Sequence, residues 1–82
     1  MMNIGMLWFD NDPKADFKIK LERATDYYRT KYGQNPNVCF VHPSMVPSNQ
    51  TKSGLIEIRP NRSVRPNHFW IGINGSLEHA NA

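Results

Sequence analysis

The sequence predicts a small α/β domain, a sheet of about four strands in the chain order β-α-β-β-β with one helix packed on one face. Three runs of large apolar residues indicate strands, at residues 4–9, 38–41 and 68–73, and an amphipathic stretch from about residue 13 to residue 32 indicates the helix. Successive side chains of a strand point to opposite faces, so these runs make both faces of the sheet apolar. A single helix can cover only one of them, so we expect the other to meet a second copy of the chain, a different protein or the loop around Met45 and Val46.

The first strand ends at a polar segment, residues 10–13, that carries the signals of a helix start. Proline favours the first helical position and aspartate the position before it, so we expect Asp12 to cap the helix and Pro13 to open it. Gly33, followed by Pro36, is typical of a helix end. Between these limits, apolar side chains recur at steps of three and four residues, which predicts one buried stripe. The stripe consists of Phe17, Leu21, Ala24, Tyr28 and Tyr32.

The second strand, residues 38–41, completes a strand–helix–strand unit, which predicts a right-handed crossover and parallel first and second strands. A polar loop, residues 44–54, leads to a third strand, residues 55–59, whose isoleucines share one face and whose charged residues share the other. This alternation is typical of an edge strand. Two arrangements remain open. Either the third strand turns back antiparallel to the second, which we favour, or the fourth strand lies antiparallel to the first.

Length and composition fit one domain, residues 1–74, followed by a loose C-terminal tail, residues 75–82. A chain of this size buries only about 60–65% of its unfolded surface, so association through the second apolar face would add stability. The net charge of +3, from ten lysine and arginine and seven acidic residues, permits contact with anions. The single Cys39 cannot form an internal disulfide, and no segment has the pattern of a signal or a membrane span, so the sequence indicates a cytoplasmic protein without a membrane role.

Two aspartates and a histidine form the first candidate site. Asp10 and Asp12 follow the first strand and His42 follows the second, and the carboxyl ends of parallel strands meet at one end of a sheet. Such groups can hold a divalent metal or act as an acid–base pair, so a metal-assisted hydrolase is one alternative function. Helix capping and a surface histidine explain the same positions. Because no established metal, nucleophile or cofactor motif is present, we predict no metal and no cofactor, and favour a protein that is not an enzyme.

The second candidate is the connection between the third and fourth strands, called the arginine loop here (residues 59–67). It contains no acidic residue and has Arg-Pro-Asn at both ends. Arginine forks fit phosphate oxygens and asparagine can reach base edges, so nucleic-acid binding is the other alternative function. Stacking of bases on Tyr27 or Trp70 would strengthen it, although a soluble hairpin connection shaped by two prolines explains the loop as well. The candidate residues are Arg59, Arg62, Arg65 and Asn67.

The lead prediction is a non-enzymatic association module that docks through the apolar sheet face left uncovered by the helix. The expected partner is a second copy of the chain, giving a homodimer, or a larger protein to which the chain is an accessory subunit. The sequence does not decide which side chains face the helix. The residues expected at the interface are Leu7, Phe9, Cys39, Val41 and Trp70.

Four segments of the chain also resemble a pattern in short, uncharacterised bacterial proteins. They are residues 7–10 (LWFD), the helix end with YYR at 27–29 and YG at 32–33, residues 36–43 (PNVCFVHP) and residues 66–72 (PNHFWIG). The resemblance spans nearly the whole chain. It implies a free-standing small protein, and it carries no activity, cofactor or site residue with it.

Overall fold

The computed structural model describes residues 2–46 and 52–74, and the expected tail at 75–82 lies outside them. One α-helix packs against a five-stranded mixed sheet, which confirms the α/β class. The strand that was not predicted is β3 (Lys52–Ser53), which has only two residues and lies within the expected loop 44–54. So short a strand has no periodic pattern by which the sequence could reveal it. The elements are β1 (Met2–Phe9), α1 (Phe17–Tyr32), β2 (Val38–Val41), the 3-10 helix η1 (Pro43–Met45), β3 (Lys52–Ser53), β4 (Ile56–Pro60) and β5 (His68–Asn74).

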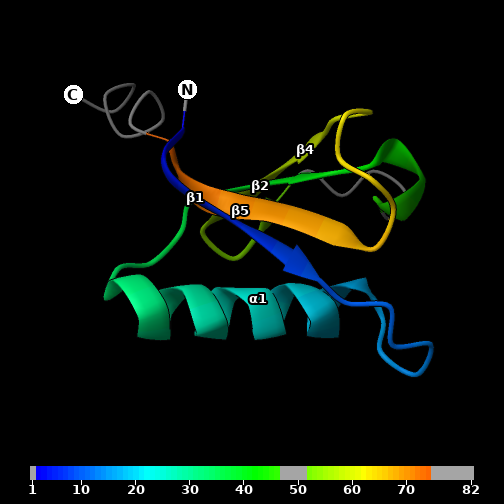
Figure 1. Ribbon diagram of the computed structural model, residues 1–82, viewed down its shortest axis with the longest axis horizontal. Coiled ribbons are helices and arrows are strands. Elements are labelled where there is room, and N and C mark those ends of the chain that lie inside the picture. The colour runs from blue at the N-terminus through cyan, green and yellow to red at the C-terminus, as the bar shows by residue number, and fades with distance from the viewer. Residues whose placement is uncertain (1, 47–51, 75–82) are drawn as a thin grey trace.

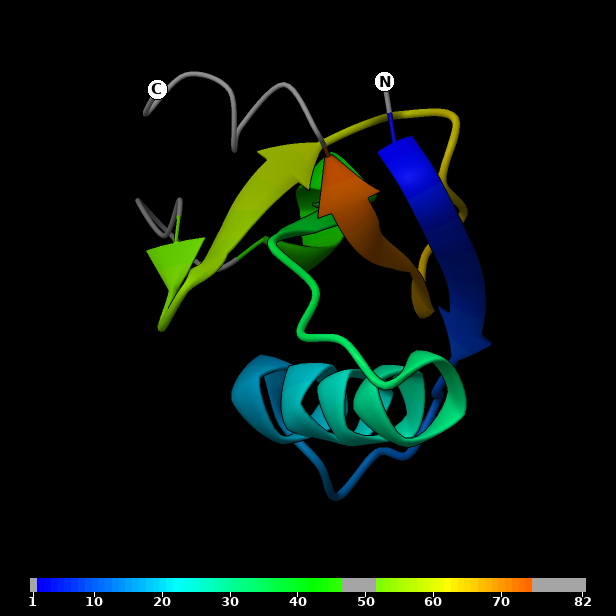
Figure 2. The same cartoon turned by 90° about the vertical axis from the view of Figure 1, so that its left-hand side faces the viewer.

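The strands are arranged in the order β1-β5-β2-β4-β3, with α1 on one side of the sheet (Figures 1 and 2). β5 runs antiparallel to both of its neighbours, β1 and β2. The first two strands therefore point the same way, as predicted, but β5 separates them. In Figure 2, β1 and the short β3 lie at opposite edges of the sheet.

The direction of β4 corrects the favoured prediction. β4 pairs with β2 in parallel and with β3 in antiparallel, so it is neither antiparallel to β2 nor an edge strand. The cause is a tight hairpin between β3 and β4, in which Gly54 has a φ of 59°. Glycine adopts this left-handed conformation without steric cost. The hairpin reverses the chain once more before β4 begins, which aligns β4 with β2.

The helix begins four residues later than predicted. Asp16, rather than Asp12, is the N-cap, and its Oδ1 accepts the N–H of Ile19 at 2.9 Å. The segment before it forms a turn in which the Ala15 N–H donates to the Asp12 carbonyl at 3.3 Å. The predicted end is confirmed, since Gly33 has a φ of 69° and its N–H donates to the Arg29 carbonyl at 2.8 Å.

The core lies between α1 and the sheet. Leu21, Ala24 and Tyr28 of the predicted stripe are buried, and Phe17 packs its ring 5.7 Å from that of Phe69 on β5. Among the residues that the structure describes, no helix is long and apolar enough to span a bilayer. The sheet residues buried on the helix side are Met6, Cys39, Val41, Ile56, Ile58, Phe69, Ile71 and Ile73.

The other side of the sheet, called the open face below, carries the alternate side chains. Strand register places Leu7, Trp70 and Phe40 in one row across β1, β5 and β2. Leu7 and Phe9 are 56% and 55% exposed, and Trp70 is 38% exposed. The part of this face formed by β1 and β5 therefore presents large apolar groups to solvent.

Candidate binding surface

The carboxyl ends of β1, β2 and β4 lie at one end of the sheet together with the start of β5 (Figure 1). Backbone hydrogen bonds connect them. The Asp10 N–H donates to the Asn67 carbonyl at 2.9 Å, and the Asn61 N–H donates to the Val41 carbonyl at 2.7 Å. The fourth strand is thus antiparallel to the first, and both candidate clusters lie at the same end of the sheet.

The two aspartates are held by an arginine from α1. Arg23 Nη1 lies 3.2 Å from Asp10 Oδ2 and 3.1 Å from Asp12 Oδ2. Burial acts to raise the pKa of Asp10, but the Asp12 N–H and Arg23 outweigh it and hold this pKa below its usual value. The Lys14 N–H and then Arg23 lower the pKa of Asp12. Both groups are ionised at neutral pH and already have partners, so they suit a structural role better than proton transfer.

His42 has a structural role of its own at the start of η1. Its Nδ1 accepts the Ser44 N–H at 3.1 Å and lies 2.7 Å from Ser44 Oγ. Within residues 2–46 and 52–74, no three histidine, cysteine, aspartate or glutamate side chains lie together as a metal ion would need. In the structure Asp10 and Asp12 are paired with Arg23, and His42 is paired with Ser44.

The arginine loop is ordered by its own hydrogen bonds. The Asn61 side chain accepts the Ser63 N–H at 2.8 Å, and the His68 N–H donates to the Arg65 carbonyl at 3.1 Å. Asn67 has a φ of 66°, a conformation that asparagine tolerates better than most residues, and this turns the chain into β5. The structure thus assigns Asn67 a backbone role at this turn.

The three arginines differ in their partners. Arg59 donates from Nε to the carboxylate of Glu57 on the same strand. Arg62 and Arg65 are exposed, and neither has an acidic partner among the described residues. Positive charge that no neighbouring acid balances is therefore concentrated at the tip of the loop.

The arginine loop meets the open face at a hollow of about 460 Å³, which we call the arginine hollow. Phe9 lies beside it, with its ring 4.8 Å from that of His68. Val64 and His68 were not among the binding residues predicted from the sequence; the alternation of His68 with Trp70 along β5 is the signal that could have identified the histidine. The residues that line the hollow are Leu7, Ser63, Val64, Arg65, His68 and Trp70.

The residues expected at an association interface divide between the two faces. Leu7, Phe9 and Trp70 lie on the open face and are exposed. Cys39 and Val41 are fully buried on the helix side, so their inclusion was wrong, because the parity of β2 directs them into the core. Burial also raises the pKa of the Cys39 thiol to about 12, which leaves it protonated and unreactive.

The edge of β1 is a further feature that sequence reasoning missed. β1 ends the sheet in the described structure and pairs only with β5. On its helix side, the Trp8 ring packs 5.2 Å from Tyr27, which is 50% exposed. A shallow hollow of about 440 Å³ opens beside them, and the Trp8 indole N–H has no hydrogen-bond partner in the described structure. Tyr27 thus lies on the helix side of β1 and does not line the arginine hollow.

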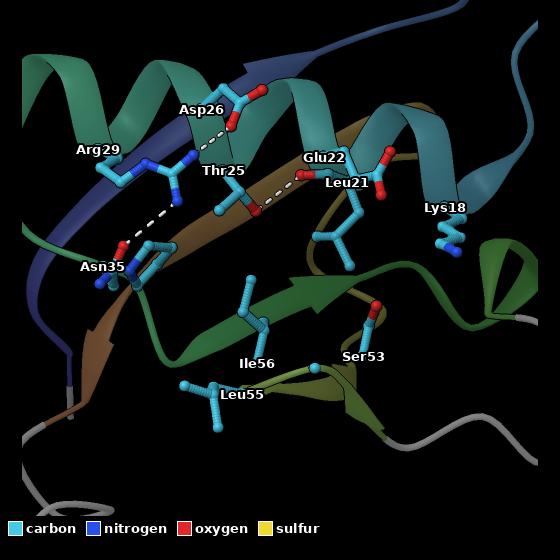
Figure 3. A pocket seen from close by; sticks show the side chains of 12 residues that line it. Lys18, Leu21, Glu22, Thr25, Asp26, Arg29, Asn35, Ser53, Leu55 and Ile56 are labelled. Carbon is cyan, nitrogen blue, oxygen red and sulfur yellow. Dashed lines mark hydrogen bonds and ion pairs between the residues drawn. The ribbon is translucent and has the colours of Figure 1, made fainter.

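A larger groove of about 600 Å³ separates α1 from the β3–β4 hairpin (Figure 3). Leu21, Leu55 and Ile56 supply its apolar surface. Several of its polar side chains are paired with one another or with the backbone: Arg29 donates to Asp26 and to Asn35, and the Thr25 hydroxyl donates to the Leu21 carbonyl. The groove contains none of the candidate site residues.

Comparison of the chain with protein-family models, with curated proteins and with solved structures found no match. Its function must therefore be argued from the described surface.

Proposed function

We propose that the chain is a non-enzymatic association module, which forms a homodimer through the free edge of β1 and the apolar side chains on either side of it. The observation that carries this proposal is the position of the exposed apolar groups. Leu7 and Phe9 flank the edge on the open face, and Tyr27 flanks it on the helix side, each at least half exposed. Burying this surface would be favourable, and a monomer leaves it in water.

The backbone of β1 supports the same interface. The Asp10 N–H points toward β5, and N–H directions alternate along a strand, so those of Leu7 and Phe9 point away from β5. β1 has eight residues without a charge or a proline, and its one irregularity is a register shift between Met2 and Ile4. Edge strands are commonly shortened or charged to prevent pairing. β1 lacks both protections.

A second copy of the chain is the partner that this edge fits best. Antiparallel pairing of β1 with its own copy creates a two-fold axis, so one surface serves both protomers. The charges that border the edge are paired within the chain, Arg23 with Asp10 and Asp12, and Asp26 with Arg29. Two copies can therefore approach without bringing unpaired like charges together. The two sheets would join into one continuous sheet.

The state of the candidate catalytic groups supports an association role rather than catalysis. Asp10 and Asp12 are held in ion pairs, His42 caps η1, and the Cys39 thiol is buried with a raised pKa. A buried, protonated thiol also suits a reducing compartment, so we place the protein in the cytoplasm.

Light scattering of the purified chain at low and high salt tests the proposal. We expect twice the chain mass of 9.5 kDa at both salt concentrations, because the interface is apolar and backbone-paired. A mass of 9.5 kDa at every concentration and salt level would contradict the homodimer. A docking role on a larger protein would then be the surviving form of the association hypothesis.

A further inference from the structure

We propose that the arginine loop and the open face beside it bind single-stranded nucleic acid. This goes beyond association, because pairing at the β1 edge would cover Leu7 and Phe9 but leave the arginine loop and the part of the open face formed by β5 accessible to solvent. Two features meet here: positive charge at the loop tip that no acidic side chain balances, and the rings of His68 and Trp70 on β5.

The charge comes from Arg62 and Arg65. Both are exposed, and neither has an acidic partner in the described structure. Arg65 also lines the arginine hollow, so it lies directly beside the apolar surface. A guanidinium fork fits phosphate oxygens in a bidentate manner. The loop is held by internal hydrogen bonds, which reduces the entropy lost when a ligand orders it.

The rings come from the sheet. Trp70 is 38% exposed, and it lines the arginine hollow together with His68. His68 and Trp70 are two positions apart on β5, so both face the same side at a spacing of about 7 Å. Aromatic faces of this kind stack unpaired bases with little sequence preference.

Exposed arginines beside aromatic rings favour a ligand that carries both phosphates and accessible bases. A polyanion without bases would use the arginines and leave the rings unused, whereas an apolar partner would use the rings and leave Arg62 and Arg65 unbalanced. A duplex presents phosphates but keeps its bases stacked inside. A flexible strand with exposed bases can satisfy both features at once.

Fluorescence anisotropy with labelled single-stranded DNA and RNA oligonucleotides of mixed sequence tests this inference on the full chain. We expect binding that weakens as salt increases. Replacing Trp70 by leucine, which keeps the site apolar, should weaken binding on the order of tenfold through lost stacking. The double change Arg62→Gln and Arg65→Gln should weaken binding at least as strongly and lower the salt dependence.

The matched control is Lys14→Gln with Lys18→Gln, which removes the same charge from exposed positions outside the arginine hollow. It should bind within about twofold of the unchanged chain, since only long-range charge is lost. Equal losses in both double variants, or equal affinity for heparin and the oligonucleotides, would overturn the inference by showing non-specific attraction. Preference for duplex, or no binding at low salt, would also overturn it. The arginine variants should keep the solution mass of the unchanged chain, which separates this test from that of the homodimer.

Discussion

Replacing Leu7 by aspartate is expected to convert the proposed homodimer into a monomer. The change places a carboxylate beside the β1 edge, where dimerisation would bury it without a partner, and it removes a side chain that is 56% exposed in the single chain. Loss of such a central contact costs about 2 kcal/mol or more, a factor of about 30 in the dissociation constant. Light scattering over a dilution series measures the shift.

Leu55 provides the matched control for this variant. It is also a leucine on the surface, 84% exposed, and it follows Gly54 in the β3–β4 hairpin near the opposite edge of the sheet. Leu55→Asp introduces the same charge and should leave the dimer intact. If Leu7→Asp and Leu55→Asp have the same mass as the unchanged chain, the β1 edge is not the interface.

Replacing Phe69 by alanine is expected to lower the free energy of unfolding by about 3–5 kcal/mol. Phe69 is fully buried between the sheet and α1, and its ring packs against that of Phe17, so the change leaves a cavity. Urea unfolding followed by circular dichroism measures the loss.

Ile19→Ala is the control for the core variant, because Ile19 lies on the exposed side of α1. It should cost within about 0.5 kcal/mol. Both variants are best compared in the Leu7→Asp background, because dimerisation adds its own free energy to apparent stability. A loss at Phe69 no larger than that at Ile19 would show that the helix does not pack on this face of the sheet.

The helix and the main strands could be predicted because local periodicity encodes them. The stripe through Leu21, Ala24 and Tyr28 identified the buried side of α1, and the apolar runs identified β1, β2 and β5. Their order in the sheet could not be predicted, because periodicity says which side chains are buried and not which strand pairs with which. In the simplest strand–helix–strand unit β1 and β2 would pair directly, but here β5 lies between them.

The candidate residues were found from the sequence, but their grouping depended on the direction of one strand. The hairpin at Gly54 aligns β4 with β2, which brings the arginine loop to the end of β1. The two-residue turn at Gly54 and Leu55 thus determines at which end of the sheet the arginine loop lies. The helix cap was predicted at Asp12 because Asp12 precedes Pro13, whereas in the structure Asp16 is the cap and accepts the Ile19 N–H.

Amide hydrogen exchange at Leu7 and Phe9 tests pairing at the β1 edge most directly. Their N–H groups point away from β5, so in a monomer they face solvent and exchange fast, whereas those of Met6 and Trp8 are protected by β5. If two copies pair through β1, Leu7 and Phe9 should be protected at concentrations where the chain is dimeric, and lose protection in Leu7→Asp. Fast exchange at Leu7 and Phe9 in a chain of dimeric mass would show that the copies meet elsewhere.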